Sequence, residues 1–241
     1  MTPLDRRGGL AVWRQIAQQL QTDIEERRIA PGARLPTEAA LAQQFAVNRH
    51  TVRRAIGDLE DRGLVRVQRG RGTFACAELI DYPVSERTRF SENIRRNRQA
   101  PGGRLLSSEH VPADKALAER FGVSPGAALL HIESLRTADG VPVTLSSAYY
   151  PAARFDGLAE AVERHGAITP ALAEFGVSDY RRLETRVSAT LASRRDGKLL
   201  AVSEGAPLLV THAVNVDSDG HTIQVSEARY PAERVQLTVE S

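Results

Sequence analysis

The chain has 241 residues, 41% of them hydrophobic and 26% charged, a composition that is typical of globular proteins with a sizeable core and excludes general disorder. Its single cysteine, Cys76, excludes an internal disulfide and a cysteine-rich zinc site. Residues 1–10 lack a signal-peptide pattern, and no apolar run is long enough to cross a bilayer, so we expect a cytoplasmic protein without a membrane partner.

The net charge of +2 is unevenly distributed along the chain. Residues 1–75 contain 13 arginines, no lysine and 8 acidic residues, a balance of +5, which leaves −3 for the remainder. A basic segment of this kind is expected where a chain contacts a polyphosphate. The asymmetry therefore favours a nucleic-acid partner for the first third of the chain.

Three helices are predicted in this first third. Apolar residues at four-residue spacing indicate a helix over residues 12–28, and a shorter helix is predicted over residues 37–45. After a brief turn, Asn48 is expected to cap a third helix that turns its apolar residues inward. Two short helices joined by a turn of about three to four residues are typical of the helix-turn-helix, whose second helix reads base edges in the major groove.

Arginines are concentrated on the outer side of the third helix and in the segment that follows it. Alternation over residues 64–75, with Gly70 and Gly72 at the turn, predicts a β-hairpin, and a basic hairpin beside a helix-turn-helix is a wing. An arginine face on one helix is often only solvated, but the ordered combination of these elements favours DNA binding. The candidate residues for contact with double-stranded DNA are Arg34, Thr37, Glu38, Asn48, Arg49, His50, Thr51, Arg53, Arg54, Arg69, Gly70 and Arg71.

Three stretches of this region, Leu35–Ala42, Val47–Ala55 and Arg69–Phe74, resemble the GntR superfamily of transcription regulators. The resemblance implies that Arg49, Thr51 and Arg53 contact operator DNA and that Arg69 and Gly70 enter the minor groove. It also implies a homodimer. Ala39 stands where many members carry an arginine, so one contact is expected to be missing.

The rest of the chain is rich in predicted hairpins. We assign residues 1–75 to the DNA-binding domain, 76–88 to a linker without periodicity, and 89–241 to a second domain. Strands are predicted at residues 104–111, 129–136, 141–150, 182–191, 208–216, 223–230 and 235–239, and short helices at 90–97, 113–121, 157–164, 169–175 and 194–200. Hairpins that follow one another directly favour an antiparallel sheet with helices packed against it, so the expected fold class is α+β.

The second domain is similar to the effector domain of the HutC branch of the superfamily, the UTRA domain, through Leu130–Arg136, Asp139–Pro142 and Ser146–Pro151. That resemblance implies a chorismate-lyase-like fold. Within the branch, Asp81–Pro83 followed by Arg87–Ile94 looks like the regulators of phosphonate uptake and breakdown, the PhnF type. The resemblance implies a repressor controlled by a small anionic effector, for which a phosphonate or a phosphate-bearing metabolite is our hypothesis.

The candidate effector-binding residues are Arg89, Ser91, Asn93, Arg136, Ser147, Tyr149, Gln224 and Tyr230. Arg89, Ser91 and Asn93 stand at the start of a predicted helix, where backbone N–H groups and the helix dipole favour an anion. The resemblance implies that residues matching Ser91, Arg136, Ser147 and Tyr149 line a ligand pocket. Alternatively, Ser91 is only a helix cap and Arg136 a solvated strand residue.

An enzyme is the competing interpretation: a lyase or hydrolase of chorismate-lyase-like fold with an accessory nucleic-acid module. The motif Gly122-Val123-Ser124-Pro125-Gly126 matches the G-x-S-x-G of serine hydrolases. A nucleophile elbow follows a strand and precedes a helix, whereas Ser124 follows a predicted helix and precedes a strand, so we expect a plain turn. The six histidines show no metal-ligand spacing, and neither a metal nor a cofactor is expected.

Overall fold

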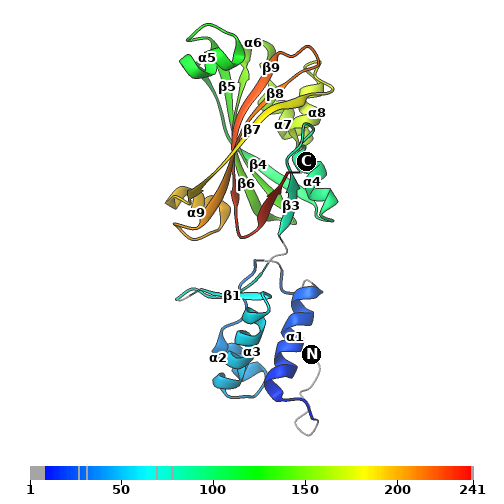
Figure 1. The fold of residues 1–241 in the computed structure, drawn as a ribbon, viewed down its shortest axis with the longest axis vertical. Helices are drawn as coiled ribbons and strands as arrows, with labels where there is room; N and C mark the ends of the chain where they lie inside the picture. The colour runs from blue at the N-terminus through cyan, green and yellow to red at the C-terminus, as the bar shows by residue number, and fades with distance from the viewer. Residues whose placement is uncertain (1–8, 27, 31, 69, 77–78, 240–241) are drawn as a thin grey trace. The chain divides into compact units, whose positions relative to one another are not determined.

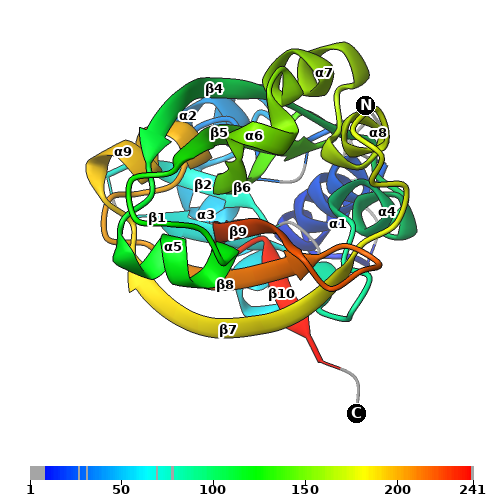
Figure 2. The ribbon, with the colours of Figure 1, turned by 90° about the horizontal axis from the view of Figure 1, so that it is seen from above.

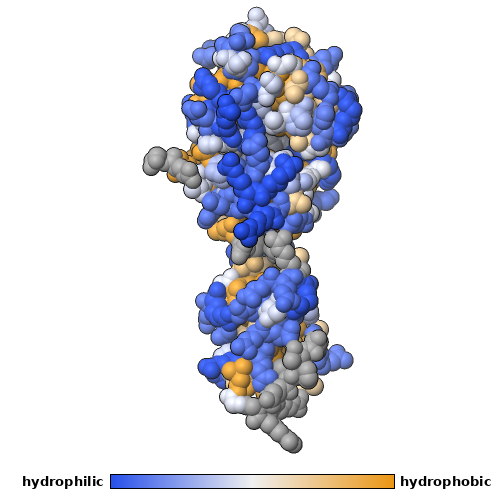
Figure 3. Space-filling model, turned by 90° about the vertical axis from the view of Figure 1, so that its right-hand side faces the viewer, coloured by the Kyte–Doolittle hydropathy of each residue, from blue (hydrophilic) through white to orange (hydrophobic). Residues whose placement is uncertain are grey.

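The computed structural model describes residues 9–26, 28–30, 32–68, 70–76 and 79–239. The chain divides into two compact units, Met1–Glu78 and Leu79–Ser241. The surface shown in Figure 3 is mostly hydrophilic, because each unit places most of its apolar residues in its own core. None of the helices in the described ranges has the length and apolarity that a membrane span requires.

In its described residues, the first unit consists of three helices and a two-stranded hairpin (Figure 1). They are α1 (Val12–Glu25), α2 (Glu38–Gln44), α3 (Arg49–Asp61), β1 (Val65–Gln68) and β2 (Gly72–Ala75). The Thr37 hydroxyl accepts a hydrogen bond from the Ala40 N–H and caps α2, and the Asn48 side chain accepts one from the His50 N–H and caps α3. The predicted Asn48 cap is thus confirmed.

The second unit is built on a six-stranded antiparallel sheet with the strand order β4-β5-β6-β9-β8-β7. The strands are β4 (Pro101–Pro112), β5 (Ala128–Ala138), β6 (Val141–Pro151), β7 (Arg181–Leu191), β8 (Pro207–Val216) and β9 (Thr222–Pro231). The predicted antiparallel α+β architecture is confirmed. Two short strands, β3 (Ile80–Pro83) and β10 (Val235–Thr238), form a separate parallel pair.

Six helices cover the two faces of this sheet: α4 (Phe90–Arg96), α5 (Lys115–Phe121), α6 (Ala152–Phe155), α7 (Leu158–His165), α8 (Ile168–Ala173) and α9 (Arg194–Leu200). Figure 2 shows the sheet curled, with α4, α7 and α8 along its open side and α5 and α9 on the other side. Apolar residues of α7 and α8 pack with Ile132, Ala148 and Tyr150 of the concave face. The concave face is thus partly covered and partly left as a cavity.

The segment predicted as a linker, residues 76–88, is shorter in the structure. Ile80–Pro83 forms β3 and pairs with β10, and the Arg182 N–H donates a hydrogen bond to the Glu86 carbonyl at 2.6 Å. Residues 80–88 therefore belong to the second unit. The sequence does not indicate β3, because a four-residue strand is too short for alternation to be recognised.

Candidate DNA-binding face and ligand cavity

The third helix, α3, separates its charged residues from its apolar ones. Arg49, His50, Arg53 and Arg54 are exposed, whereas the side of the helix that carries Val52 is buried in the core of the first unit. The separation follows from the period of 3.6 residues per turn, which places residues three and four apart on one face. Thr51 lies at the margin and is half-buried.

Two of these arginines are held by neighbouring side chains. The Arg53 guanidinium pairs with the Glu38 carboxylate through two contacts, Nε to Oε1 at 3.2 Å and Nη2 to Oε2 at 2.8 Å, and these hydrogen bonds lower the pKa of Glu38. The Arg54 guanidinium lies 4.6 Å above the Trp13 ring, a cation–π distance. The exposed cations of α3 are therefore partly oriented before DNA is bound.

The hairpin β1–β2 forms the predicted wing. Gly70 has a φ of +74° at the turn, and Gly72 has a φ of +115°, which side chains rarely adopt. A Cβ at residue 72 would meet Arg34 Nε at 2.6 Å, so the Arg34 side chain packs across the hairpin. Arg71 is exposed on the wing, whereas Arg69 lies outside the described residues.

The second unit contains a cavity of about 110 Å³ on the concave face of the sheet. Two guanidiniums line it, those of Arg136 and Arg182, together with four tyrosines and hydroxyls of several serines and threonines. None of the described residues that line the cavity is an aspartate or a glutamate. The lining is therefore cationic and rich in hydrogen-bond donors.

Arg136 has no carboxylate to neutralise it among the described residues. Its Nη1 donates a hydrogen bond to the Gly166 carbonyl at 2.9 Å, and burial lowers the pKa of its guanidinium. Thr144 lies directly opposite on β6, and its buried hydroxyl has no hydrogen-bond partner in the described structure. A half-buried cation without a carboxylate partner and an unsatisfied buried hydroxyl both cost free energy, which a bound anion would offset.

Three of the predicted effector residues, Arg136, Gln224 and Tyr230, line this cavity. Arg89 does not: its Nη2 donates to the Tyr180 carbonyl at 2.6 Å, and its guanidinium carbon lies 3.4 Å from the Tyr180 ring centre. Arg89 therefore holds Tyr180, itself a lining residue, in place.

Ser91 and Asn93 on α4 are also outside the cavity lining. Asn93 is buried, and its Nδ2 donates to the Pro83 carbonyl at 3.2 Å, so its side chain joins α4 to β3. Neither Arg89 nor Ser91 caps α4 through its side chain. We therefore do not retain Arg89, Ser91 and Asn93 in the effector site.

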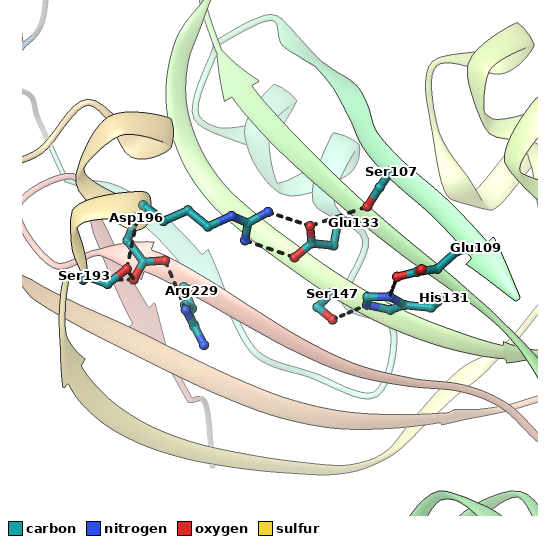
Figure 4. A network of polar contacts seen from close by, with 9 residues as sticks. Ser107, Glu109, His131, Glu133, Ser147, Ser193, Asp196 and Arg229 are labelled. Carbon is teal, nitrogen blue, oxygen red and sulfur yellow. Dashed lines mark hydrogen bonds and ion pairs between the residues drawn. The ribbon is translucent and has the colours of Figure 1, made fainter. Parts of the chain in front are cut away.

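Ser147 and Tyr149 lie on the opposite, convex face of β6. The Ser147 hydroxyl contacts His131 Nε2 at 2.8 Å, and the His131 and Tyr149 rings stack with centroids 4.6 Å apart. Figure 4 shows Ser147 and His131 pointing toward each other within a polar network on this face. Because successive side chains of a strand alternate between faces, residues 147 and 149 cannot share the cavity with the lining residues Ser146, Ala148 and Tyr150.

The sequence interpretation missed the cavity residues Thr144, Tyr150, Arg182 and Asn215. The sequence could have indicated Thr144 and Tyr150, because alternation along β6 places them on the same face of the sheet as the buried Ala148. Arg182 and Asn215 come from other strands, and only the sheet order brings them to the same face.

On the convex face, Ser147, His131 and Glu109 resemble the nucleophile, base and acid of a hydrolase. The His131 ring contacts the Ser147 hydroxyl on one side and the Glu109 carboxylate, at 3.4 Å, on the other. Ser147, however, sits in mid-strand, where β6 pairs with both β5 and β9. The backbone N–H groups beside it are engaged in the sheet, so they cannot stabilise an oxyanion. Ser124 lies in the turn between α5 and β5, as predicted.

Asp217, Asp219 and His221 gather at the β8–β9 turn in a group that could hold a cation. Asp217 already accepts hydrogen bonds from Arg154 at 2.6 Å and from the backbone N–H groups of the other two residues. These bonds account for the geometry of the turn.

Comparison with known proteins gives the family. Residues 13–75 match the model of the bacterial regulatory proteins of the gntR family, and residues 96–236 match the UTRA domain. The HTH-type transcriptional regulator RB1450 of Rhizobium meliloti is 38% identical over 239 residues, covering 99% of this chain and 98% of its own. The HTH-type transcriptional repressor PhnF of Mycolicibacterium smegmatis is 30% identical over 207 residues, covering 86% of this chain and 84% of its own.

Among solved structures, the crystal structure of PhnF from Mycobacterium smegmatis matches with a TM-score of 0.64 at 26% identity, covering 96% of this chain and 99% of that one. These relatives are transcription regulators, so the enzyme alternative is not supported. The chain belongs to the gntR family of bacterial transcription regulators and carries a UTRA domain behind its helix-turn-helix.

Proposed function

We propose that the chain is a repressor whose affinity for operator DNA is controlled by a small anionic effector bound on the concave face of the second unit. The observation that carries this proposal is the cavity lining, which has two guanidiniums and no carboxylate among its described residues. Charged hydrogen bonds from guanidinium to an oxyanion are strong and directional, so an anion fits this lining better than a neutral or cationic molecule.

DNA is proposed to bind the face formed by the α3 arginines and the wing. Arg49 and Arg53 are exposed near the N-terminus of α3, the part of a recognition helix that reaches base edges in the major groove. Arg34 and Arg71 lie at the hairpin, where they would contact phosphates or the minor groove. The repressor role is supported by the similarity to the HTH-type transcriptional repressor PhnF of Mycolicibacterium smegmatis.

For the effector, we propose a phosphonate or a phosphate-bearing metabolite. Such groups present several acceptor oxygens, which match the guanidiniums and the many hydroxyl donors of the cavity. The similarity to proteins named PhnF supports the same class.

Control of DNA binding requires that the effector bind two arrangements of the protein with different affinity. Tyr82, Thr88 and Phe90 line the cavity and lie within the first residues of the second unit. A ligand would therefore contact the segment that leads directly from the boundary between the units. We propose that this contact transmits ligand binding to the DNA-binding unit.

We also propose that the active species is a homodimer. β7 is an edge strand, paired only with β8 in the described sheet, and it exposes Leu183, Val187 and Leu191 by 58%, 52% and 68%. A long edge strand with exposed apolar side chains is a template for pairing with another chain. A second copy of β7 across a two-fold axis would cover it and suit an operator with two half-sites.

Isothermal titration calorimetry of the full chain with inorganic phosphate, methylphosphonate and a sugar phosphate tests the effector proposal. We expect saturable binding of at least one of these anions and none of methanol or glucose. Arg136→Met should abolish the heat of binding. Silence from all the anions would overturn the proposed chemistry of the cavity.

A further inference from the structure

A row of polar side chains crosses the concave face from one edge of the sheet to its middle. Arg182 on β7 lies opposite Asn215 on β8, which lies opposite Gln224 on β9. Arg182 Nε contacts Asn215 Oδ1 at 3.3 Å, Asn215 Nδ2 contacts Gln224 Oε1, and Gln224 Nε2 contacts the Tyr150 hydroxyl on β6 at 2.6 Å. All four residues line the cavity.

The direction of every hydrogen bond in this row follows from Arg182. A guanidinium has donors and no acceptor, so the Asn215 atom that faces it must be the carbonyl oxygen. The Asn215 amide nitrogen then faces Gln224 and donates to Oε1, and the Gln224 nitrogen is left to donate to Tyr150. The Tyr150 hydroxyl is thus an acceptor within the protein, and its own proton must be donated elsewhere.

Among the described residues, the Tyr150 hydroxyl donates no hydrogen bond to a protein acceptor, although Tyr150 is only 2% exposed. Burial raises the pKa of Tyr150, so the hydroxyl keeps its proton, and the charge of Arg136 is close enough to affect the same group. The unsatisfied Thr144 hydroxyl, opposite Arg136, lines the same cavity. The Tyr150 and Thr144 hydroxyls therefore face the same cavity as the Arg136 guanidinium, and neither donates to a protein acceptor among the described residues.

We infer that Arg182, Asn215 and Gln224 are positioning residues that fix Tyr150 as a hydrogen-bond donor to the ligand, so that the ligand group bound there is an acceptor, which in the proposed anionic effector is an oxyanion oxygen. This inference rests on the proposed effector function of the cavity. A ligand ammonium or other donor-only group at this position would face the Tyr150 proton and be rejected. Gln224 is then a specificity determinant, because a glutamate there would accept the Tyr150 proton itself.

The inference is tested by reversing the hydrogen bonds of the row while leaving Tyr150 and Arg136 in place. In Asn215→Asp, the carboxylate can still accept from Arg182 but cannot donate to Gln224. The Gln224 amide would then turn over and accept the Tyr150 proton. Anion affinity, measured by calorimetry with inorganic phosphate and methylphosphonate, should fall about tenfold or more, and Tyr150→Phe should cause a similar loss. Gln224→Glu is a second route to the same reversal. Its charge control is Ser226→Asp, which adds a carboxylate to the same cavity lining outside the row.

The decisive comparison is the double variant. If Asn215 acts through the Tyr150 proton, Asn215→Asp should cause a clearly smaller loss in the Tyr150→Phe background, where only the charge effect measured in Ser226→Asp remains. Equal losses in both backgrounds, or full affinity in Asn215→Asp and Gln224→Glu, would overturn the inference while leaving the anionic effector in place. Absence of anion binding by the unmodified chain would instead overturn the proposed function and this inference with it.

Discussion

At the scale of single residues, the Arg53–Glu38 pair matters more for orientation than for stability. The Arg53 side chain is 63% exposed, and exposed ion pairs contribute little to the free energy of unfolding. The pair does hold the guanidinium in one place beside Glu38 of α2, with its other N–H donors available for DNA.

We therefore expect Arg53→Ala, and likewise Arg49→Ala, to weaken operator binding by about 1–3 kcal/mol per lost bidentate base contact and to relax sequence preference. Thermal stability should stay close to that of the unmodified protein. Fluorescence anisotropy with operator and scrambled duplexes measures both effects, and Arg195→Ala, an exposed arginine of the second unit, is the control. Unchanged operator affinity in both variants would contradict the assignment of α3 as the reading helix.

Arg136 leads to different predictions for anion binding and for thermal stability. Because this half-buried guanidinium has no carboxylate partner among the described residues, Arg136→Met should abolish anion binding without lowering Tm. Calorimetry and thermal unfolding of the same sample check this. A large fall in Tm would show that Arg136 is a structural residue and not a ligand anchor.

At the scale of elements, α9 begins with a capping box that makes its stability depend on pH. Burial by itself raises the pKa of the Asp196 carboxyl, but hydrogen bonds from Ser193 and Arg229 outweigh it, and the pKa is lowered overall. A carboxylate whose pKa is lower in the folded chain stabilises the fold above its unfolded pKa of about 4, and this stabilisation is lost as the pH falls below that value.

Asp196→Asn should therefore cost about 1–3 kcal/mol near neutral pH, where the hydrogen-bonded charge is lost. The difference in stability from the unmodified chain should shrink as the pH is lowered from about 5 toward 3. Urea unfolding across this pH range measures it, with the exposed Glu163→Gln as control. A difference that does not depend on pH would contradict the stabilising role of the Asp196 charge.

Helices and strands could be predicted from the sequence where they are long enough to show a repeating pattern of apolar residues. The six long strands and the capped helices follow from alternation and from residues such as Asn48, because these signals are local. The helix α6, four residues long, and β3 escaped because they are too short to show a period. The cavity was only partly predicted: Arg136, Gln224 and Tyr230 were found, but Arg182 reaches the same space through the order of strands, which the sequence does not display.

At the scale of the whole molecule, the proposed dimer depends on β7. A lysine in place of Val187 or Leu191 would place a charge in the proposed contact between two copies. We expect Val187→Lys and Leu191→Lys to be monomeric by light scattering and to bind operator more weakly. Val239→Lys, at a residue more exposed than either, should behave as the unmodified chain. Monomers in all samples, or dimers in all, would contradict the role of β7.

Footprinting of the purified protein on its own promoter, with and without methylphosphonate or phosphate, tests the central claim most directly. We predict a protected stretch with two half-sites about one helical turn apart at moderate ionic strength, weakened by added salt. The anion should change the protection in the unmodified protein and leave it unchanged in Arg136→Met. The absence of any protected stretch, or protection that no anion alters, would contradict the account.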